Sequence, residues 1–428
     1  MITDAPTAQQ RTCAEFATGR KIIVGKVYES GTALPRCADV IVIGAGLVGL
    51  ATAFYAARAR LGSVVVLERG HDLADLTSAH SAEGFRLEWD APENIAMVRE
   101  SIDVFARFAD VVGVPGHDVG FAPCGYLFVS SSTGAVRRQA RLRDRVAWWH
   151  KNGLSDVEYM DGDEARRRFP FVGPHVQEAH FRAGDGFVSA MDVARGFARG
   201  GRFDTFLRTG VAGIETNGGQ VVGVRTMDGQ RVSTRTAVVC AGPFSASLAE
   251  TAGARLPVHN RRRHGLVVFL PPGLIELNGP MVVDADLGLY WRPRPEGIFI
   301  GWEQALPWDQ RPAPAMDPVP ADWRYLLRVR RHGRRLTKFW DQIPFTDVVW
   351  HTGQYVAPAC NDGRPVIGLH PDVGGLWINT AYEGRGVMAS PGGGRLLVDF
   401  IQHPRDGAVS PFRVFADTRA NPPDQMVL

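Results

Sequence analysis

The chain has 428 residues, of which 45% are hydrophobic and 22% charged, as in an ordinary globular protein long enough for two domains. Its 48 lysine and arginine residues and 45 aspartate and glutamate residues leave a net charge of +3, too small to indicate nucleic-acid binding. The sequence contains no apolar run of the roughly eighteen residues that a membrane-spanning helix needs. Five scattered cysteines without a CxxC pair, and no apolar stretch fit for a signal peptide, lead us to expect a cytoplasmic protein without a metal site.

The first predicted elements form a strand–turn–helix unit. Residues 1–37 contain no convincing core element, and we expect them to form an extension outside the fold. The apolar run Val40–Ile43 predicts a strand buried on both faces, which leads into Gly44-x-Gly46-x-x-Gly49 and a helix. In such a turn the first glycine allows the tight bend, the second lets the backbone approach a pyrophosphate, and the third lets helix and strand pack closely.

The next strand completes the motif. Val64–Leu67 is apolar and ends in Glu68. An acidic residue about 20 residues beyond the glycines can accept the ribose hydroxyls of an adenine dinucleotide. The motif therefore predicts a dinucleotide cofactor, without deciding between FAD and NAD.

Further elements continue the alternation of helices and strands. A 3.6-residue apolar period predicts a helix over Asn94–Phe108, and residues 121–182 mix short strands with arginine-rich helices. More strands are predicted at 211–214, 221–225, 231–234, 236–242, 288–292, 297–301 and 375–379, and helices at 323–343 and 391–401.

These elements predict an α/β fold with a Rossmann-like cofactor domain that is discontinuous in sequence and an inserted α+β substrate domain with a mixed sheet. We expect the cofactor domain to comprise residues 38–90, 185–255 and 350–428, and the substrate domain residues 91–184 and 256–349.

The chain resembles the D-amino-acid-oxidase-like FAD oxidoreductases, the family of glycine oxidase, sarcosine oxidase and dimethylglycine dehydrogenase. The resemblance covers about residues 38–402 and rests on the glycine motif with Glu68 and on four further segments. These segments are Thr77–Arg86, Val238–Ser245, Asn361–Gly368 and Gly384-x-Gly386 before a helix. The resemblance implies FAD as the cofactor, since one long flavin can thread through all of these segments.

The resemblance also implies which residues hold FAD. Covalent attachment through His80 is an alternative, because dimethylglycine-dehydrogenase-like relatives use a histidine in that loop, but we expect non-covalent FAD. The expected cofactor-binding residues are Gly44, Gly46, Leu47, Val48, Gly49, Glu68, Arg69, Ser78, Ser81, Val211, Ala241, Gly242, Phe244, Gly363, Gly384, Arg385, Gly386, Val387 and Met388.

Four residues are the expected catalytic and substrate-binding residues: Arg86, Tyr290, His351 and Tyr355. Arg86 matches an arginine that binds the substrate carboxylate in sarcosine-oxidase-like relatives, a task that suits a guanidinium fork; its alternative is a salt bridge to Glu83 or Glu88. Tyr290 matches a pocket tyrosine. His351 and Tyr355 precede the turn that lies near the flavin in the family.

Several positions depart from the family pattern. Phe299 stands where sarcosine oxidases place an oxygen-activating lysine, and Met388 stands where they place a second carboxylate-binding lysine. Ala357 replaces an arginine of glycine-oxidase relatives. Glu303 and Glu383 are further polar candidates that can contact a cationic group. These differences argue against glycine or sarcosine as the substrate and against oxygen as the electron acceptor.

The sequence thus predicts an FAD-dependent amine or amino-acid oxidase or dehydrogenase, which transfers hydride to flavin N5 and releases an imine that hydrolyses. Three alternatives stay open: a 2-hydroxy-acid dehydrogenase of the same fold, a flavin subunit of a multi-subunit amine dehydrogenase, and a nicotinamide-dependent enzyme. The expected partners are a small amine or amino acid and an electron acceptor, either oxygen or a redox protein. The sequence leaves open whether the chain forms a homo-oligomer.

Overall fold

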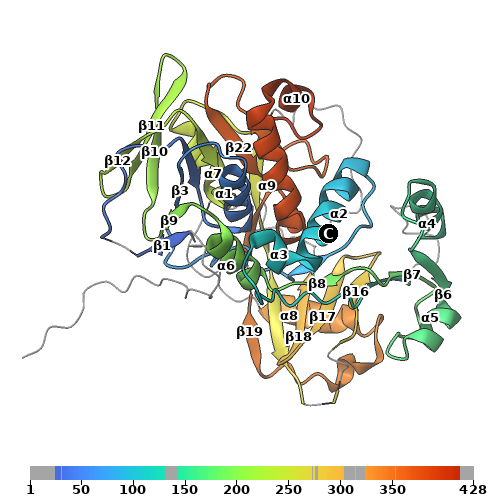
Figure 1. Cartoon of the computed structure of the whole chain (residues 1–428). Coiled ribbons are helices and arrows are strands. Elements are labelled where there is room, and N and C mark those ends of the chain that lie inside the picture. The colour runs from blue at the N-terminus through green and yellow to red at the C-terminus, as the bar shows by residue number, and fades with distance from the viewer. Residues whose placement is uncertain are drawn as a thin grey trace, which may run out of the picture.

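The computed structural model describes residues 25–29, 31–131, 142–271, 273–274, 278–302, 314, 323–351 and 353–414. Two large sheets organise this part of the chain, one toward the upper left and one toward the lower right of Figure 1. The described residues contain no helix that combines the length and hydropathy needed to cross a bilayer.

The first sheet has seven strands, all parallel to their neighbours except the last pair. Along its strand at Val40–Ile43, Val40 and Val42 face one side of the sheet, and Ile41 and Ile43 the other. Both sides are covered, which explains why this strand is apolar throughout. The strand order is β1 (Lys26–Tyr28), β9 (Asp204–Phe206), β3 (Val64–Leu67), β2 (Val40–Ile43), β13 (Ala237–Val239), β22 (Leu376–Thr380) and β21 (Val366–Leu369).

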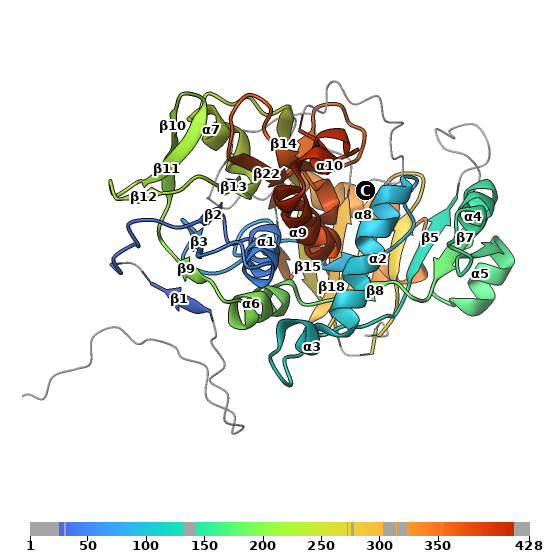
Figure 2. The same ribbon diagram turned by 45° about the horizontal axis from the view of Figure 1, so that its top comes forward.

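Helices and a small sheet provide the covering layers (Figure 2). One face packs against α1 (Leu47–Arg58), α6 (Ala190–Gly200) and α9 (Gly386–Gln402). The other face packs against α7 (Ser245–Glu250) and a three-stranded sheet of β10 (Val211–Asn217), β11 (Gln220–Thr226) and β12 (Arg231–Ser233).

The second sheet has eight strands. One of its faces packs against α5 (Gly162–Arg168), α8 (Trp323–Gly333) and the 3₁₀ helix η3 (Lys338–Gln342). Residues on its other face share a core with the helices of the first sheet, so the two sheets form one continuous core. The strand order is β19 (Val348–Trp350), β15 (Gly265–Phe269), β18 (Gly297–Trp302), β17 (Leu289–Arg294), β16 (Met281–Asp284), β5 (Tyr126–Ser130), β7 (Glu178–Arg182) and β6 (Glu158–Asp161).

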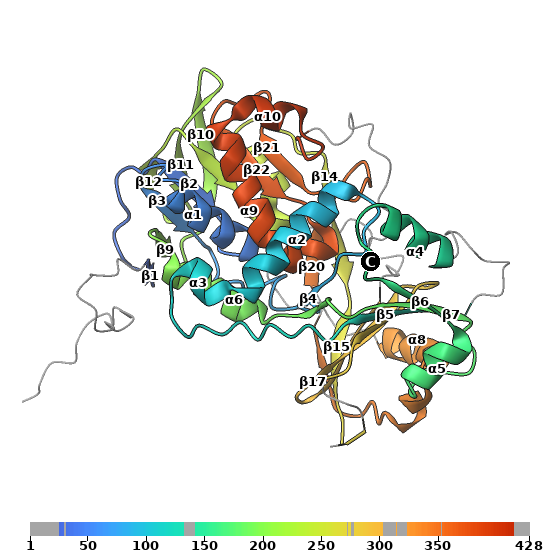
Figure 3. The same ribbon diagram turned by 45° about the vertical axis from the view of Figure 1, so that its right-hand side comes forward.

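Two short strand pairs and further helices complete the described fold, and Figure 3 shows α2 lying beside α9. The pairs are β14 (Val258–Arg263) with β20 (Gly353–Pro358), and β4 (Gly84–Phe85) with β8 (Gly186–Phe187). The helices are α2 (Pro92–Ala106), α3 (Phe108–Val112), α4 (Leu142–Lys151), α10 (Pro404–Val409), and the 3₁₀ turns η1 (Gly242–Phe244) and η4 (Glu383–Arg385).

The predicted fold class is confirmed: a Rossmann-like sheet lies next to a second, mixed sheet. The strands of the first sheet come from 38–90, 185–255 and 350–428, with β1 added, and those of the second come from 91–184 and 256–349, with Trp350 added. The domain boundaries themselves stay a prediction.

Three elements differ from the expectations. Residues 26–28 do not lie outside the fold but form edge strand β1, where Tyr28 stacks on Phe206; three residues are too few for a periodic signal. The helix expected over 323–343 ends at Gly333, and the chain turns back so that the Trp340 ring packs where a side chain at 333 would start.

Helix α9 begins at Gly386, ahead of the predicted start at Pro391. A proline inside a helix lacks the N–H that would bond to the carbonyl four residues earlier. Here the Ser390 hydroxyl donates to that carbonyl, of Val387, at 3.1 Å. The Val387 carbonyl therefore keeps a hydrogen bond where the helix passes through the proline.

Candidate functional site

The glycine turn between β2 and α1 has the geometry of a pyrophosphate site. Gly44 has a φ of 108°, which favours glycine, and an added Cβ at Gly49 would come within 1.9 Å of the Gly44 carbonyl oxygen. An added Cβ at Gly46 would meet no atom within 4 Å. Gly44 and Gly49 therefore close the turn, while Gly46 leaves space before the N-terminus of α1, where phosphate oxygens can meet backbone N–H groups.

Glu68 lies beside this turn at the end of β3. The N–H groups of Ala45 and Gly70 donate to its two carboxylate oxygens, each at 2.6 Å. Burial raises the pKa of Glu68, against the effect of these two donors. Each oxygen keeps a lone pair for a ribose hydroxyl, as the sequence predicts. The Arg69 guanidinium, 3.6 Å from the centre of the Phe244 ring, closes this end of the site.

A cavity of about 460 Å³ extends from the glycine turn to the second sheet. All residues predicted for the site line it except Gly49, Gly363 and Arg385. Gly49 packs helix against strand, and the Gly363 carbonyl accepts a hydrogen bond from Asn94 at 3.0 Å. Arg385 is buried behind the cavity wall, with its guanidinium 4.9 Å from the Trp89 ring centre.

The loop around residues 77–81 closes the middle of the cavity. The Thr77 hydroxyl donates to the carbonyl of Gln354 on β20. His80 lines the cavity next to His351, with ring centres 5.6 Å apart. Burial, and then the neighbouring His80, lower the pKa of His351 to about 4. Burial lowers the pKa of His80 as well. The His351 ring is uncharged near neutral pH, and neither buried Nδ1 atom has a hydrogen-bond partner within the described residues.

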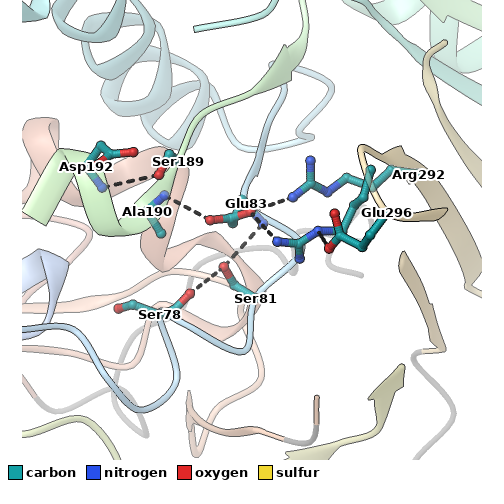
Figure 4. Close-up of polar contacts among 9 residues, drawn as sticks. Ser78, Ser81, Glu83, Ser189, Ala190, Asp192, Arg292 and Glu296 are labelled. Atoms are coloured by element: carbon teal, nitrogen blue, oxygen red, sulfur yellow. Dashed lines mark hydrogen bonds and ion pairs between the residues drawn. The ribbon is translucent and has the colours of Figure 1, made fainter. Parts of the chain in front are cut away.

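Glu83 ties this loop to both halves of the molecule (Figure 4). Its carboxylate accepts a hydrogen bond from the N–H of Ala190, at the start of α6, at 3.0 Å and forms an ion pair with Arg292 of β17 at 2.5 Å. The sequence offers Glu83 only as a salt-bridge partner of Arg86. Its backbone φ is 56°. Its contacts with both halves could not be predicted from the sequence, because they depend on how the two sheets lie relative to each other.

Arg86 reaches the cavity while its side chain is nearly fully buried. Its guanidinium lies 3.7 Å from the centre of the Trp89 ring, and Nη1 donates to the Glu88 carbonyl at 2.5 Å. These two contacts orient the guanidinium fork before any ligand binds.

Arg263 also lines the cavity, and sequence reasoning missed it. It ends β14, and its guanidinium lies 4.9 Å from the centre of the Tyr355 ring. The sequence signal for it is the run Arg261–Arg263 directly before His264. Because neighbouring side chains of a strand point to opposite faces, such a run places at least one arginine on each face.

Glu383 supplies a buried carboxylate to the same cavity. Its backbone φ is 52°. Its Oε2 has no hydrogen-bond partner within the described residues but forms an ion pair with Arg385 Nη2 at 3.6 Å. Burial raises the pKa of Glu383, and the nearby arginines, first Arg385, lower it. Glu303, the other polar candidate, lies outside the described residues.

The second sheet closes the far end of the cavity. Side chains from four of its strands line it: Tyr126 of β5, Met281 and Val283 of β16, Tyr290 of β17 and Phe299 of β18. The Tyr290 and Phe299 rings are nearly parallel, with centres 6.3 Å apart.

The open space at Gly46, the carboxylate of Glu68 and the long cavity that reaches the second sheet fit an adenine dinucleotide. Fold and site thus define a dinucleotide-dependent oxidoreductase.

Comparison with known proteins identifies the family. Residues 39–400 match the model of the DAO family, FAD dependent oxidoreductase, and the chain belongs to this family. FAD-dependent oxidoreductase domain-containing protein 1 of Xenopus laevis is 25% identical over 426 residues, covering 87% of this chain and 80% of that protein. Glycine oxidase of Bacillus licheniformis is 25% identical over 369 residues, covering 85% of this chain and 92% of that protein.

A solved structure shares the fold. L-Proline dehydrogenase from P. horikoshii superposes with a TM-score of 0.76 at 19% identity, covering 91% of this chain and 100% of that one. The predicted FAD cofactor and the predicted enzyme class, an FAD-dependent oxidoreductase, are confirmed by the family. The nicotinamide-dependent alternative is thereby excluded.

Proposed function

We propose that this enzyme oxidises the carbon–nitrogen bond of an amino acid or a secondary amine. The substrate ammonium group would first lose a proton to solvent. Bound FAD would then accept at N5 the hydride that leaves the substrate carbon, while the freed nitrogen lone pair completes the C=N bond of an imine that water hydrolyses. The observation that carries the proposal is the shared cavity, whose lining includes the guanidinium groups of Arg86 and Arg263 and the carboxylate of Glu383 as well as the residues that fit the cofactor. Groups of both signs suit a zwitterionic substrate.

The proposed roles follow from the contacts of each residue. Arg86 would bind the substrate carboxylate, because the Trp89 ring and the Glu88 carbonyl already orient its guanidinium and little side-chain freedom is lost on binding. The Glu383 oxygen without a hydrogen-bond partner would accept an N–H of the amine. Tyr290 would contact the substrate from the second sheet. His351, uncharged near neutral pH, and Tyr355 would complete the wall without repelling an ammonium group.

The test is anaerobic reduction of the flavin by a panel of N-methyl amino acids, D-amino acids and 2-hydroxy acids. We expect amines to bleach the flavin absorption and 2-hydroxy acids to leave it unchanged. Arg86→Lys should raise KM for the amine at least tenfold with a smaller effect on kcat, since a lysine cannot form two parallel hydrogen bonds to a carboxylate. Arg263→Lys is the matched control. If it raises KM more than Arg86→Lys does, Arg263 and not Arg86 binds the substrate carboxylate.

Other outcomes would contradict the proposal. Bleaching by 2-hydroxy acids alone would indicate a 2-hydroxy-acid dehydrogenase. A flavin that no compound reduces until a second protein is added would indicate a subunit of a larger amine dehydrogenase. Readmission of air then tests the electron acceptor: with Phe299 in the cavity wall, we expect slow reoxidation and a redox partner other than oxygen.

Two further expectations stay proposals. We propose that FAD is held without a covalent bond, so acid precipitation of the protein should release it into solution. We also propose a cytoplasmic location. The four cysteines within the described residues, Cys37, Cys124, Cys240 and Cys360, are free thiols, which supports a reducing compartment.

A further inference from the structure

Resting on the proposed function, we infer that the substrate carries a bulky apolar group with a flat face, such as an aromatic ring, and that the cavity side of the eight-stranded sheet binds it. Glycine and sarcosine have no such group. The inference depends on three features: the side chains on this sheet face, the glycines beneath two of them, and the positions of the two arginines.

The part of this sheet face that lines the cavity is apolar and aromatic, while Arg292 on the same face is paired with Glu83. Side chains alternate along the strands, so that one set lines the cavity and the other is buried in the core beneath the sheet. The cavity set comprises Tyr126, Met281, Val283, Tyr290 and Phe299. The intervening residues of these strands, including Leu127, Val282, Trp291 and Ile300, belong to the core on the opposite face.

Two glycines let the aromatic rings lie across the sheet. Gly301 pairs with Tyr290 in the sheet, and an added Cβ at Gly301 would come within 2.2 to 2.6 Å of three atoms at the phenol end of Tyr290. An added Cβ at Gly265 would come within 2.9 Å of the Phe299 ring. Each ring therefore occupies the place where a neighbouring strand's side chain would start. The rings lie low over the backbone and leave the space above them to the substrate.

The two arginines adjoin different strands of this sheet face, which we call the aromatic floor. The Arg86 guanidinium lies 5.3 Å from the ring centre of Phe128, on β5, whereas Arg263 directly precedes His264 and β15. From β5 to β15 the sheet order runs through β16, β17 and β18. With strands about 4.8 Å apart, the backbones of β5 and β15 lie roughly 19 Å apart across the sheet. A carboxylate bound at either end leaves a long apolar surface that a substrate as small as glycine would not cover.

The experiment measures ligand size preference in the holoenzyme and in Gly301→Ala. Calorimetry compares acetate with phenylacetate, which bind without being oxidised, and flavin reduction compares sarcosine with N-methylphenylalanine. We expect the wild-type protein to favour the aromatic member of each pair at least tenfold. Gly301→Ala should lift the Tyr290 ring into the cavity and reduce that ratio at least tenfold. Gly213→Ala, on β10, where an added Cβ meets no atom nearer than 3.5 Å, is the control and should keep the wild-type ratio.

Each outcome decides one of the two proposals. The inference would be overturned if the wild-type protein bound acetate as tightly as phenylacetate or more tightly. It would also be overturned if a folded Gly301→Ala protein with full FAD content kept the wild-type preference for the aromatic ligand. If Gly301→Ala does not fold, the wild-type ratios alone decide. If aromatic carboxylates bind preferentially but no amine of any size reduces the flavin, the proposed function fails while the apolar binding surface stands.

Discussion

Glycines of one motif have separable tasks in this protein. Gly49 is required for packing, because any side chain there would collide with the Gly44 carbonyl, whereas Gly46 has free space around its missing Cβ. Gly46 also has a φ of −68°, which every residue type adopts. A side chain at 46 would therefore interfere with the cofactor, and one at 49 with the fold.

The variants Gly46→Ala and Gly49→Ala separate these tasks. We expect Gly46→Ala to leave the melting temperature of the apoprotein nearly unchanged and to weaken FAD binding at least tenfold. Gly49→Ala should destabilise the apoprotein itself, by about 1–3 kcal/mol or more, as overpacking does. Thermal unfolding of the apoproteins and titration with FAD, followed by quenching of its fluorescence, measure both. Equal losses in both variants would contradict the division of tasks.

The single residues show where sequence reasoning works and where it stops. The task of Gly49 follows from its spacing alone, since strand and helix must approach each other in a turn of this length. The role of Arg263 does not, because nothing local shows that its strand passes the cavity. Arg385 was predicted to bind the cofactor because it stands between Gly384 and Gly386, yet its buried side chain does not line the cavity.

At the scale of elements, helix α9 connects the cofactor site to the core. It starts at the Gly384–Gly386 loop and passes between α1 and α2. An added Cβ at Gly392 would lie 2.4 Å from the Met97 carbonyl oxygen of α2, and one at Gly394 would lie 2.8 Å from the backbone of Ala51 in α1. These glycines lower the helix propensity of α9, but they are the positions at which it contacts α1 and α2.

We expect Gly394→Ala to separate α9 from α1. The added methyl group meets backbone that cannot move aside, so the cost should be about 1–3 kcal/mol despite the better helix propensity of alanine. The melting temperature of the holoenzyme measures it. Gln402→Ala, at the exposed end of the same helix, is the control and should change little. A stabilised Gly394→Ala protein would show that helix propensity outweighs this contact.

At the scale of the whole molecule, buried acids couple stability to pH. Asp284 ends β16 inside the eight-stranded sheet and is 3% exposed; burial raises its pKa from 3.8 to about 7. Its Oδ1 accepts hydrogen bonds from the N–H groups of Asp286 and Leu287. The folded chain therefore binds this proton more tightly than the unfolded chain does. The contribution to stability is complete below the unfolded pKa of 3.8 and is lost as the pH rises through 7.

Asp284→Asn should remove this loss, because the amide oxygen keeps both hydrogen bonds and carries no charge. We expect a higher melting temperature than the wild type at pH 8, equivalent to about 1–4 kcal/mol, and no gain at pH 4. Thermal unfolding across this pH range measures it. Asp163→Asn, at a fully exposed carboxylate whose pKa Arg166 lowers, should give no gain at pH 8. A destabilised Asp284→Asn protein at pH 8 would show that the charged form is the favoured one.

The sequence by itself determined the cofactor half of this protein. The motif from Val40 to Glu68 is local, and its spacing dictates a strand, a turn, a helix and an acid whatever the rest of the chain does. The fold class followed from the same alternation of elements. Edge strand β1 was too short to be detected, and the packing of α9 against α1 and α2, which accompanies its course through Pro391, is not visible in the local sequence.

Only the tertiary structure decided what faces the substrate. Arg86, Arg263, Glu383 and the aromatic floor are hundreds of residues apart in places, and they line one cavity because two sheets share one core. Whether a side chain lies in a wall or behind it depends on the relative position of those sheets, which no local spacing encodes. The glycine turn with Glu68 could be predicted because it is built from nearly consecutive residues. The resemblance to a family supplied Arg86, Tyr290, His351 and Tyr355, but their arrangement between the two sheets could not be read from local spacing.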